Sequence, residues 1–161
     1  MSDRTAIRST NAALSKKRLR LWLRILKVQR QVEAELRSRL RDRHGTTLPR
    51  FDVLAALDRS ENGLKMSELS KVLMVSNGNV TGIVDRLEEE ELLARETVER
   101  DRRATIVRLT PKGRRHFVEL AAEHEVWVND LLAGLGKADA EQALDLLTRL
   151  DRAISDSGRQ S

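Results

Sequence analysis

Residues 66–113 read MSELSKVLMVSNGNVTGIVDRLEEEELLARETVERDRRATIVRLTPKG. The first half of this stretch predicts two short helices joined by a turn, and Ser76, a good N-cap residue, opens the second helix. One stripe of the second helix is apolar at helical spacing and faces a core: Val80, Ile83, Val84 and Leu87. The second half predicts two strands rich in Thr, Val and Ile, at residues 93–98 and 104–110, with an exposed charged loop between them at residues 99–103.

The outward side of the second helix carries Gly78, Thr81, Gly82 and Asp85. Each of the two glycines costs about 1 kcal/mol of helix propensity relative to Ala. This cost indicates either a close approach to DNA or avoidance of another protein segment. Small and amide side chains suit a major groove. The predicted DNA-binding set is therefore Ser76, Asn77, Gly78, Asn79, Thr81, Gly82 and Arg86, with Arg86 as a phosphate contact or, alternatively, a member of an internal salt bridge.

The loop between the two strands is the second candidate DNA contact. Arg102 and Arg103 are expected at its tip, where a guanidinium can enter a narrow minor groove. Asp101 would orient one of them through a charge-assisted pair. The alternative is a solvated turn. Helix, turn, helix and basic hairpin together predict a winged helix-turn-helix.

Residues 101–113, DRRATIVRLTPKG, resemble the wing signature D-x-R-x-x-x-V-x-L-T-x-x-G of the MarR family. Residues 79–88, NVTGIVDRLE, are similar to that family's recognition-helix pattern. The resemblance covers nearly the whole chain. It implies a homodimer whose first, fifth and sixth helices interdigitate and hold two recognition helices about one DNA turn apart. It also implies release from DNA by small aromatic anions that bind between the reader and the dimerisation helices.

The flanks of the reader are helical, so the fold class expected is mainly α with a small β-hairpin wing. A long apolar pattern at residues 11–44 predicts one helix ended by Gly45, and Thr110 with Pro111 predicts the start of another. Residues 11–46 and 111–156 are predicted dimerisation helices around a DNA-binding domain at 47–110. Residues 1–10 and 157–161 are predicted tails, the first of them mobile.

Charge is unevenly distributed along the chain. Residues 16–43 hold eleven basic and three acidic side chains, residues 100–115 hold seven and one, and residues 116–161 hold four and nine. Two basic blocks favour a polyanionic partner such as double-stranded DNA, although solvated helix faces would give the first block as well. The run Glu88 to Glu91 opposes the dipole at a helix C-terminus. We interpret it as a device for solubility or for distance from phosphate.

Several classes of protein are disfavoured by composition. The chain has no cysteine, no membrane-length apolar run and no leader pattern, so a cytoplasmic protein without disulfides or a membrane partner is expected. His44, His116 and His124 lack metal-ligand spacing. No nucleophile–base pair and no phosphate-binding glycine loop occurs. The sequence therefore predicts neither an enzyme nor a bound metal or cofactor.

The first predicted helix is also a candidate effector site. Arg20 and Arg24 form a basic rim beside Trp22, and His44 and Phe51 are expected nearby. Such a rim suits an anionic aromatic ligand, and a coenzyme A thioester would use several Arg partners. The alternatives are a solvated basic face and a tryptophan buried in a dimer interface.

These observations predict a homodimeric transcription regulator, a repressor released from a palindromic operator by an anionic aromatic effector. An activator or a regulator that ignores ligands would look the same in sequence. A protein-interaction module that kept the fold but lost DNA binding is the alternative from another class.

Overall fold

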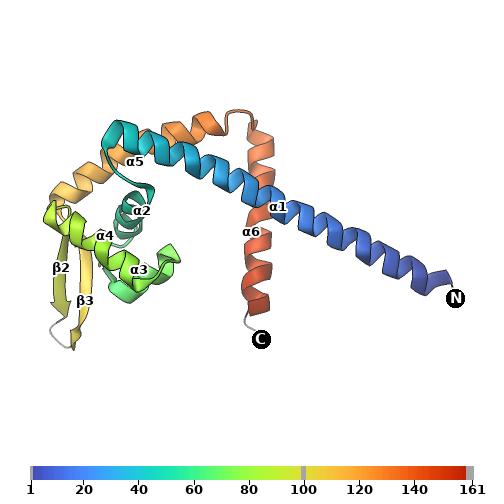
Figure 1. The fold of residues 1–161 in the computed structure, drawn as a ribbon, viewed down its shortest axis with the longest axis horizontal. Helices are drawn as coiled ribbons and strands as arrows, with labels where there is room; N and C mark the ends of the chain where they lie inside the picture. The colour runs from blue at the N-terminus through green and yellow to red at the C-terminus, as the bar shows by residue number, and fades with distance from the viewer. Residues whose placement is uncertain (1, 99–100, 159–161) are drawn as a thin grey trace. The chain divides into compact units, whose positions relative to one another are not determined.

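The computed structural model describes residues 2–98 and 101–158, with only the backbone described for residues 2–12, 98 and 101–104. The chain divides into two compact units, residues 1–124 and 125–161. The first unit holds helices α1 to α4, a three-stranded sheet and most of α5 (Figure 1). The second unit holds the end of α5, which spans Pro111–Leu131, and α6, which spans Lys137–Gly158.

Helix α1 spans Ser2–His44, so it begins at Ser2 and not near residue 11. The predicted start of this helix near residue 11 was therefore wrong. The segment has no apolar stripe, but its Arg, Ala and Ser residues still favour or tolerate a helix. The helix ends as predicted at Gly45, which has φ +59° and donates its N–H to the Arg41 carbonyl over 3.0 Å.

The core of the first unit lies where α1 and α2 meet the reader helices. Helix α2 spans Leu48–Asp58, α3 spans Met66–Leu73 and α4 spans Asn77–Glu89. The apolar stripe predicted for α4 is confirmed, because Val80, Val84 and Leu87 are buried and Ile83 is half-buried. The other elements bury the following side chains in the same core: Leu40, Phe51, Val53, Leu54, Leu57, Leu69 and Phe117. Val72 is 56% exposed at the end of α3.

The sheet has three antiparallel strands in the order β1-β3-β2. Strand β1 is the dipeptide Leu64–Lys65, too short for a sequence pattern, and it pairs with Val107 and Ile106. Strand β2 spans Leu93–Val98, and β3 spans Asp101–Leu109. Strand β3 therefore begins three residues earlier than predicted: Asp101 pairs with Val98, across a register irregularity at Thr97/Val98. Ladder pairing across the hairpin overrides the low strand propensity of Asp101, Arg102 and Arg103.

Helix α6 buries no residue within a single chain. Leu144, Leu146, Leu147 and Ile154 are each more than half exposed. A helix of this length gains most of its stability from packing an apolar face, and the apolar face of α6 is exposed here. Within the described residues, no helix has the length and apolar character needed to cross a membrane.

Candidate nucleic-acid interface

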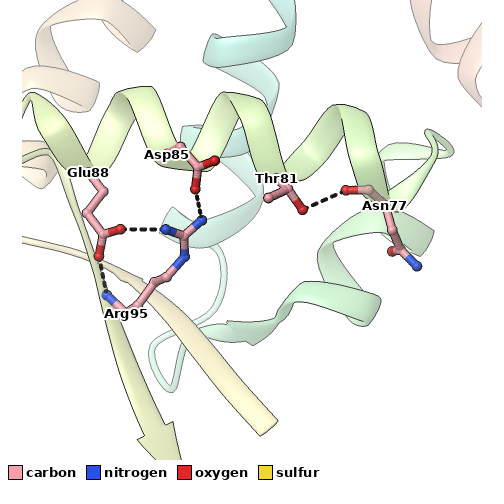
Figure 2. A network of polar contacts seen from close by, with 5 residues as sticks. All are labelled: Asn77, Thr81, Asp85, Glu88 and Arg95. Atoms are coloured by element: carbon pink, nitrogen blue, oxygen red, sulfur yellow. Dashed lines mark hydrogen bonds and ion pairs between the residues drawn. The ribbon is translucent and has the colours of Figure 1, made fainter. Parts of the chain in front are cut away.

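Helix α4 presents an open face on the side away from its core stripe. Gly78, Thr81 and Gly82 are exposed, and a Cβ atom built on either glycine would meet no atom of the described residues within 4 Å beyond its chain neighbours and the adjoining helix backbone. The Thr81 hydroxyl donates a hydrogen bond to the Asn77 carbonyl over 2.9 Å (Figure 2). The Asn77 amide extends away from this bond at the start of the helix. The face is therefore free of protein and can approach a flat or grooved partner.

The other residues of the predicted DNA-binding set lie at the same end or edge of α4. Ser76 is the N-cap residue, although its hydroxyl makes no capping hydrogen bond. Asn79 and Arg86 are exposed. Asp101, Arg102 and Arg103 belong to β3 by backbone, but their side chains lie outside the described part of the structure.

A polar groove of about 720 Å³ runs beside this open face. Gly78 and Gly82 line one side of it, and Thr47 and Arg50 from the start of α2 line the other. Sequence patterns gave no reason to place the α1–α2 junction here, because the two segments are about 30 residues apart in the chain. The groove adds hydroxyl and guanidinium donors to those that α4 carries itself.

The acidic run at the end of α4 pairs with cations from three different elements. Glu90 accepts from Arg50 of α2, Glu91 pairs with Lys112 of α5 over 3.0 Å, and Glu88 accepts from Arg95 of β2 over 2.5 Å. The hydrogen bond from Arg50 holds the pKa of Glu90 below its usual value. Three carboxylates of the run therefore form ion pairs, a role that the interpretation as a device for solubility or for distance from phosphate did not include. These carboxylates attach the end of α4 to the rest of the first unit.

The Thr-Pro-Lys-Gly segment at residues 110–113, which follows β3, also contacts the end of α4. The Thr110 hydroxyl accepts the Gly113 N–H over 2.9 Å, which confirms the predicted N-cap of α5, and donates to the Glu91 carbonyl over 2.7 Å. Lys112 also donates to the Glu90 carbonyl over 2.9 Å. These bonds satisfy carbonyl groups that the end of α4 leaves open. The last residues of the wing signature therefore also connect the start of α5 to the end of α4.

The predicted effector residues do not form one site within a single chain. Arg20, Trp22 and Arg24 are exposed on α1, and Arg24 lies about 30 Å along that helix from His44, at 1.5 Å per residue. His44 Nε2 lies 3.3 Å from a carboxylate oxygen of Glu123. Phe51 is buried in the core and stacks on His124 with ring centroids 4.3 Å apart. Burial lowers the pKa of His124. A site that combines all five residues would need two subunits.

A pocket of about 410 Å³ lies between α1, α2 and the reader helices. Leu48, Leu73 and Ile83 supply apolar walls, and Glu33 and Asp52 supply two carboxylates. Desolvation, and then repulsion from Glu33, raises the pKa of Asp52. The one guanidinium in the lining, Arg37, is paired with Glu33 over 2.8 Å. The pocket is therefore unfavourable for an anion. Asp52, an acidic residue in the middle of the apolar helix α2, was the sequence signal that could have indicated this pocket.

An exposed small-residue helix beside a β-hairpin, on a base of packed helices, defines a DNA-binding protein of the winged helix-turn-helix class. A sequence model of the MarR family matches residues 44–104. The chain is 30% identical over 156 residues to the transcriptional activatory protein BadR of Rhodopseudomonas palustris, covering 93% of this chain and 88% of BadR. The chain belongs to the MarR family, and it is a DNA-binding transcription regulator and not an enzyme.

Solved structures agree with this assignment. The regulator BldR from Sulfolobus solfataricus has a TM-score of 0.75 and 29% identity, with 87% of this chain and 96% of BldR covered. Bordetella bronchiseptica BpsR, described as regulated in its DNA binding by 6-hydroxynicotinic acid, has a TM-score of 0.68 and 26% identity. The match to BpsR covers 79% of this chain and 89% of that one.

Proposed function

We propose that the protein is a homodimeric repressor that binds a palindromic operator in the cytoplasm and is released by a small effector. The observation that carries the DNA-binding part is the open face of α4, where Gly78 and Gly82 leave no protein atom within 4 Å of a Cβ position. Arg102 and Arg103, the basic residues expected at the tip of the wing, support a second contact. Two such readers related by a two-fold axis would address half-sites about 10 base pairs apart.

The exposed apolar side chains of α1 and α6 support the dimer. On α1, Leu19, Leu21, Trp22 and Leu23 are each 54% to 58% exposed in the single chain. Together with the unpartnered α6, they form apolar surface of the kind that obligate dimers bury. We infer that residues 11–46 and 111–156 contain the subunit interface and that residues 47–110 contain the DNA-binding domain.

Replacing both Arg102 and Arg103 by Ala is expected to weaken operator binding at least tenfold and to leave the dimer intact. Each lost phosphate contact also removes about 0.9 from the slope of log affinity against log salt. Fluorescence anisotropy with a labelled operator over a range of salt concentrations measures both quantities. Size-exclusion chromatography with light scattering checks the dimer. Unchanged affinity and slope in the double variant would refute the wing contact.

For the effector, we propose an anionic aromatic molecule, a coenzyme A thioester or a free acid, bound along α1 with both subunits contributing. The seven basic and no acidic residues at 16–30 support this choice. So does the acidic lining of the 410 Å³ pocket, which disfavours an anion there. The proposed contacts are Arg20, Trp22 and Arg24 from one subunit with His44 and Phe51 from the other.

Aryl thioesters and their free acids should dissociate the operator complex of the parent protein at lower concentration than that of the Arg20→Ala and Arg24→Ala variants. The expected change with the thioesters is about tenfold for each variant, because a guanidinium–phosphate pair contributes more than a neutral hydrogen bond. Arg152→Ala, which removes an exposed cation from α6, is the control and should respond like the parent. Equal responses in all four proteins would leave the basic stretch of α1 as a solvated face.

An activator is the second candidate, and the name of BadR is the observation that favours it. In vitro transcription from a promoter that carries the operator separates the two, because a repressor lowers and an activator raises the transcript yield when protein is added. A protein-interaction module without DNA binding would produce no change in either this assay or the anisotropy assay.

A further inference from the structure

Helix α4 carries a net negative charge, which is unfavourable for a helix that must approach DNA phosphates. Between Asn77 and Glu89 it has one basic residue, Arg86, and three acidic residues, Asp85, Glu88 and Glu89, a net charge of −2. Asp85 lies on the same open face as Gly82. Every uncompensated carboxylate on that face would repel the phosphates that line a DNA groove. The structure must contain a compensating charge if this helix enters a groove.

Arg95 of β2 supplies that charge. Its guanidinium forms an ion pair with Asp85 and a second one with Glu88, whose Oε2 lies 2.5 Å from Nη1 (Figure 2). The Glu88 Oε1 atom accepts the Arg95 backbone N–H over 3.2 Å. Asp85 and Glu88 are one helical turn apart, so the planar guanidinium contacts two successive turns of α4. The Arg95 side chain is only 26% exposed, so these contacts are partly shielded from solvent.

Arg95 lies on the strand that follows α4 and leads into the wing. Strand β2 runs from Leu93 directly into the wing, and α4 is the reading helix. The side chain of Arg95 therefore connects the two elements that the proposed function assigns to DNA. Contacts to two successive turns restrain both the rotation of a helix about its axis and its tilt, whereas a contact to one turn leaves the tilt free. Rotation of α4 would move Gly78 and Gly82 off the DNA-facing side.

We propose that Arg95 is a positioning residue for DNA recognition, which fixes the rotation of α4 relative to the wing and neutralises the Asp85 and Glu88 carboxylates against operator phosphates. The inference rests on the proposed DNA-binding function. It extends that function by assigning a role to a residue that acts through α4. Partly exposed ion pairs contribute little to folding stability. Arg95 should therefore affect DNA binding far more than the melting temperature.

The Arg95→Ala variant should bind the operator at least tenfold more weakly than the parent at about 0.05 M salt, with a smaller loss at about 0.3 M, because salt screens the repulsion of the two freed carboxylates. Adding Asp85→Asn and Glu88→Gln to Arg95→Ala removes those carboxylates and should restore at least threefold of the lost affinity. A merely structural role would predict neither the salt dependence nor the recovery.

Arg108→Ala is the matched control. Arg108 pairs with Glu96 over 2.9 Å and its side chain is 35% exposed, but this ion pair lies within the hairpin and does not involve α4. This variant should bind within about twofold of the parent at both salt concentrations, since a surface ion pair contributes little. A loss equal to that of Arg95→Ala would show that any ion pair of the hairpin matters, and it would overturn the special role of Arg95.

A second readout does not depend on the folding of Arg95→Ala. The Asp85→Asn/Glu88→Gln variant keeps Arg95 but frees it from α4, so affinity for a scrambled duplex should rise and the ratio of operator to scrambled affinity should fall at least fivefold. An unchanged ratio would overturn the positioning role.

If the parent itself binds no duplex, the proposed DNA-binding function fails together with this inference. If the parent binds and Arg95→Ala binds equally well, only the inference fails.

Discussion

The Gly82→Leu variant is expected to fold at least as stably as the parent and to lose operator binding by about a hundredfold or more, which corresponds to about 3 kcal/mol. A Cβ atom at Gly82 meets nothing within 4 Å, so the leucine side chain has room in the free protein. Leucine also favours a helix interior by up to about 1 kcal/mol relative to Gly. The same side chain would separate α4 from the base edges that this face must reach.

Thermal unfolding and anisotropy with the labelled operator measure the two parts of this prediction. Gly82→Ala provides a graded comparison, because one methyl group should raise stability similarly and weaken binding less than leucine does. A Gly82→Leu variant that is less stable than the parent would mean that this face packs on protein in the dimer. A variant that still binds its operator would mean that another face of α4 reads DNA.

The Gly113→Ala variant is expected to lose about 3 kcal/mol of folding free energy, the upper range for overpacking a closely packed site. A Cβ atom at residue 113 would overlap the Leu92 carbonyl oxygen and stand 2.8 Å from its carbonyl carbon. Both are backbone atoms, and the same oxygen accepts the Thr110 N–H over 3.0 Å. Relief would need a shift of the start of α5 away from β2. The melting temperature should fall by about 6 to 12 °C.

Gly82→Ala is again the control for stability, since the same chemical change in open helical surface should stabilise by up to about 1 kcal/mol. Differential scanning calorimetry at matched protein concentration compares the three proteins, because the stability of a dimer depends on concentration. Equal melting temperatures for Gly113→Ala and the parent would show that α5 and β2 can separate there, contrary to the close approach in the structure.

Local sequence patterns were sufficient to predict most of the helices and strands. The stripe Val80, Val84 and Leu87 defined the buried side of α4, and glycine on the opposite side defined its open face. Strand periodicity located β2, and an N-cap followed by proline located α5. Such patterns work because the period of the backbone decides which side chains share a face, and burial of one face dominates the free energy. Strand β1 and the start of α1 escaped prediction, because neither carries an apolar period.

The sequence by itself therefore determined the winged helix class, the orientation of the reading helix and the unequal distribution of charge. The tertiary structure alone decided which charges meet. Arg50 pairs with Glu90 across 40 positions of the chain, Lys112 with Glu91 across 21, and Arg95 with Asp85 across 10. A cation carries no local signal of its partner, because Coulomb attraction depends on distance in space and any nearby Arg or Lys satisfies it. The close approach of Gly113 to Leu92 was hidden for the same reason, since only packing brings the two backbones together.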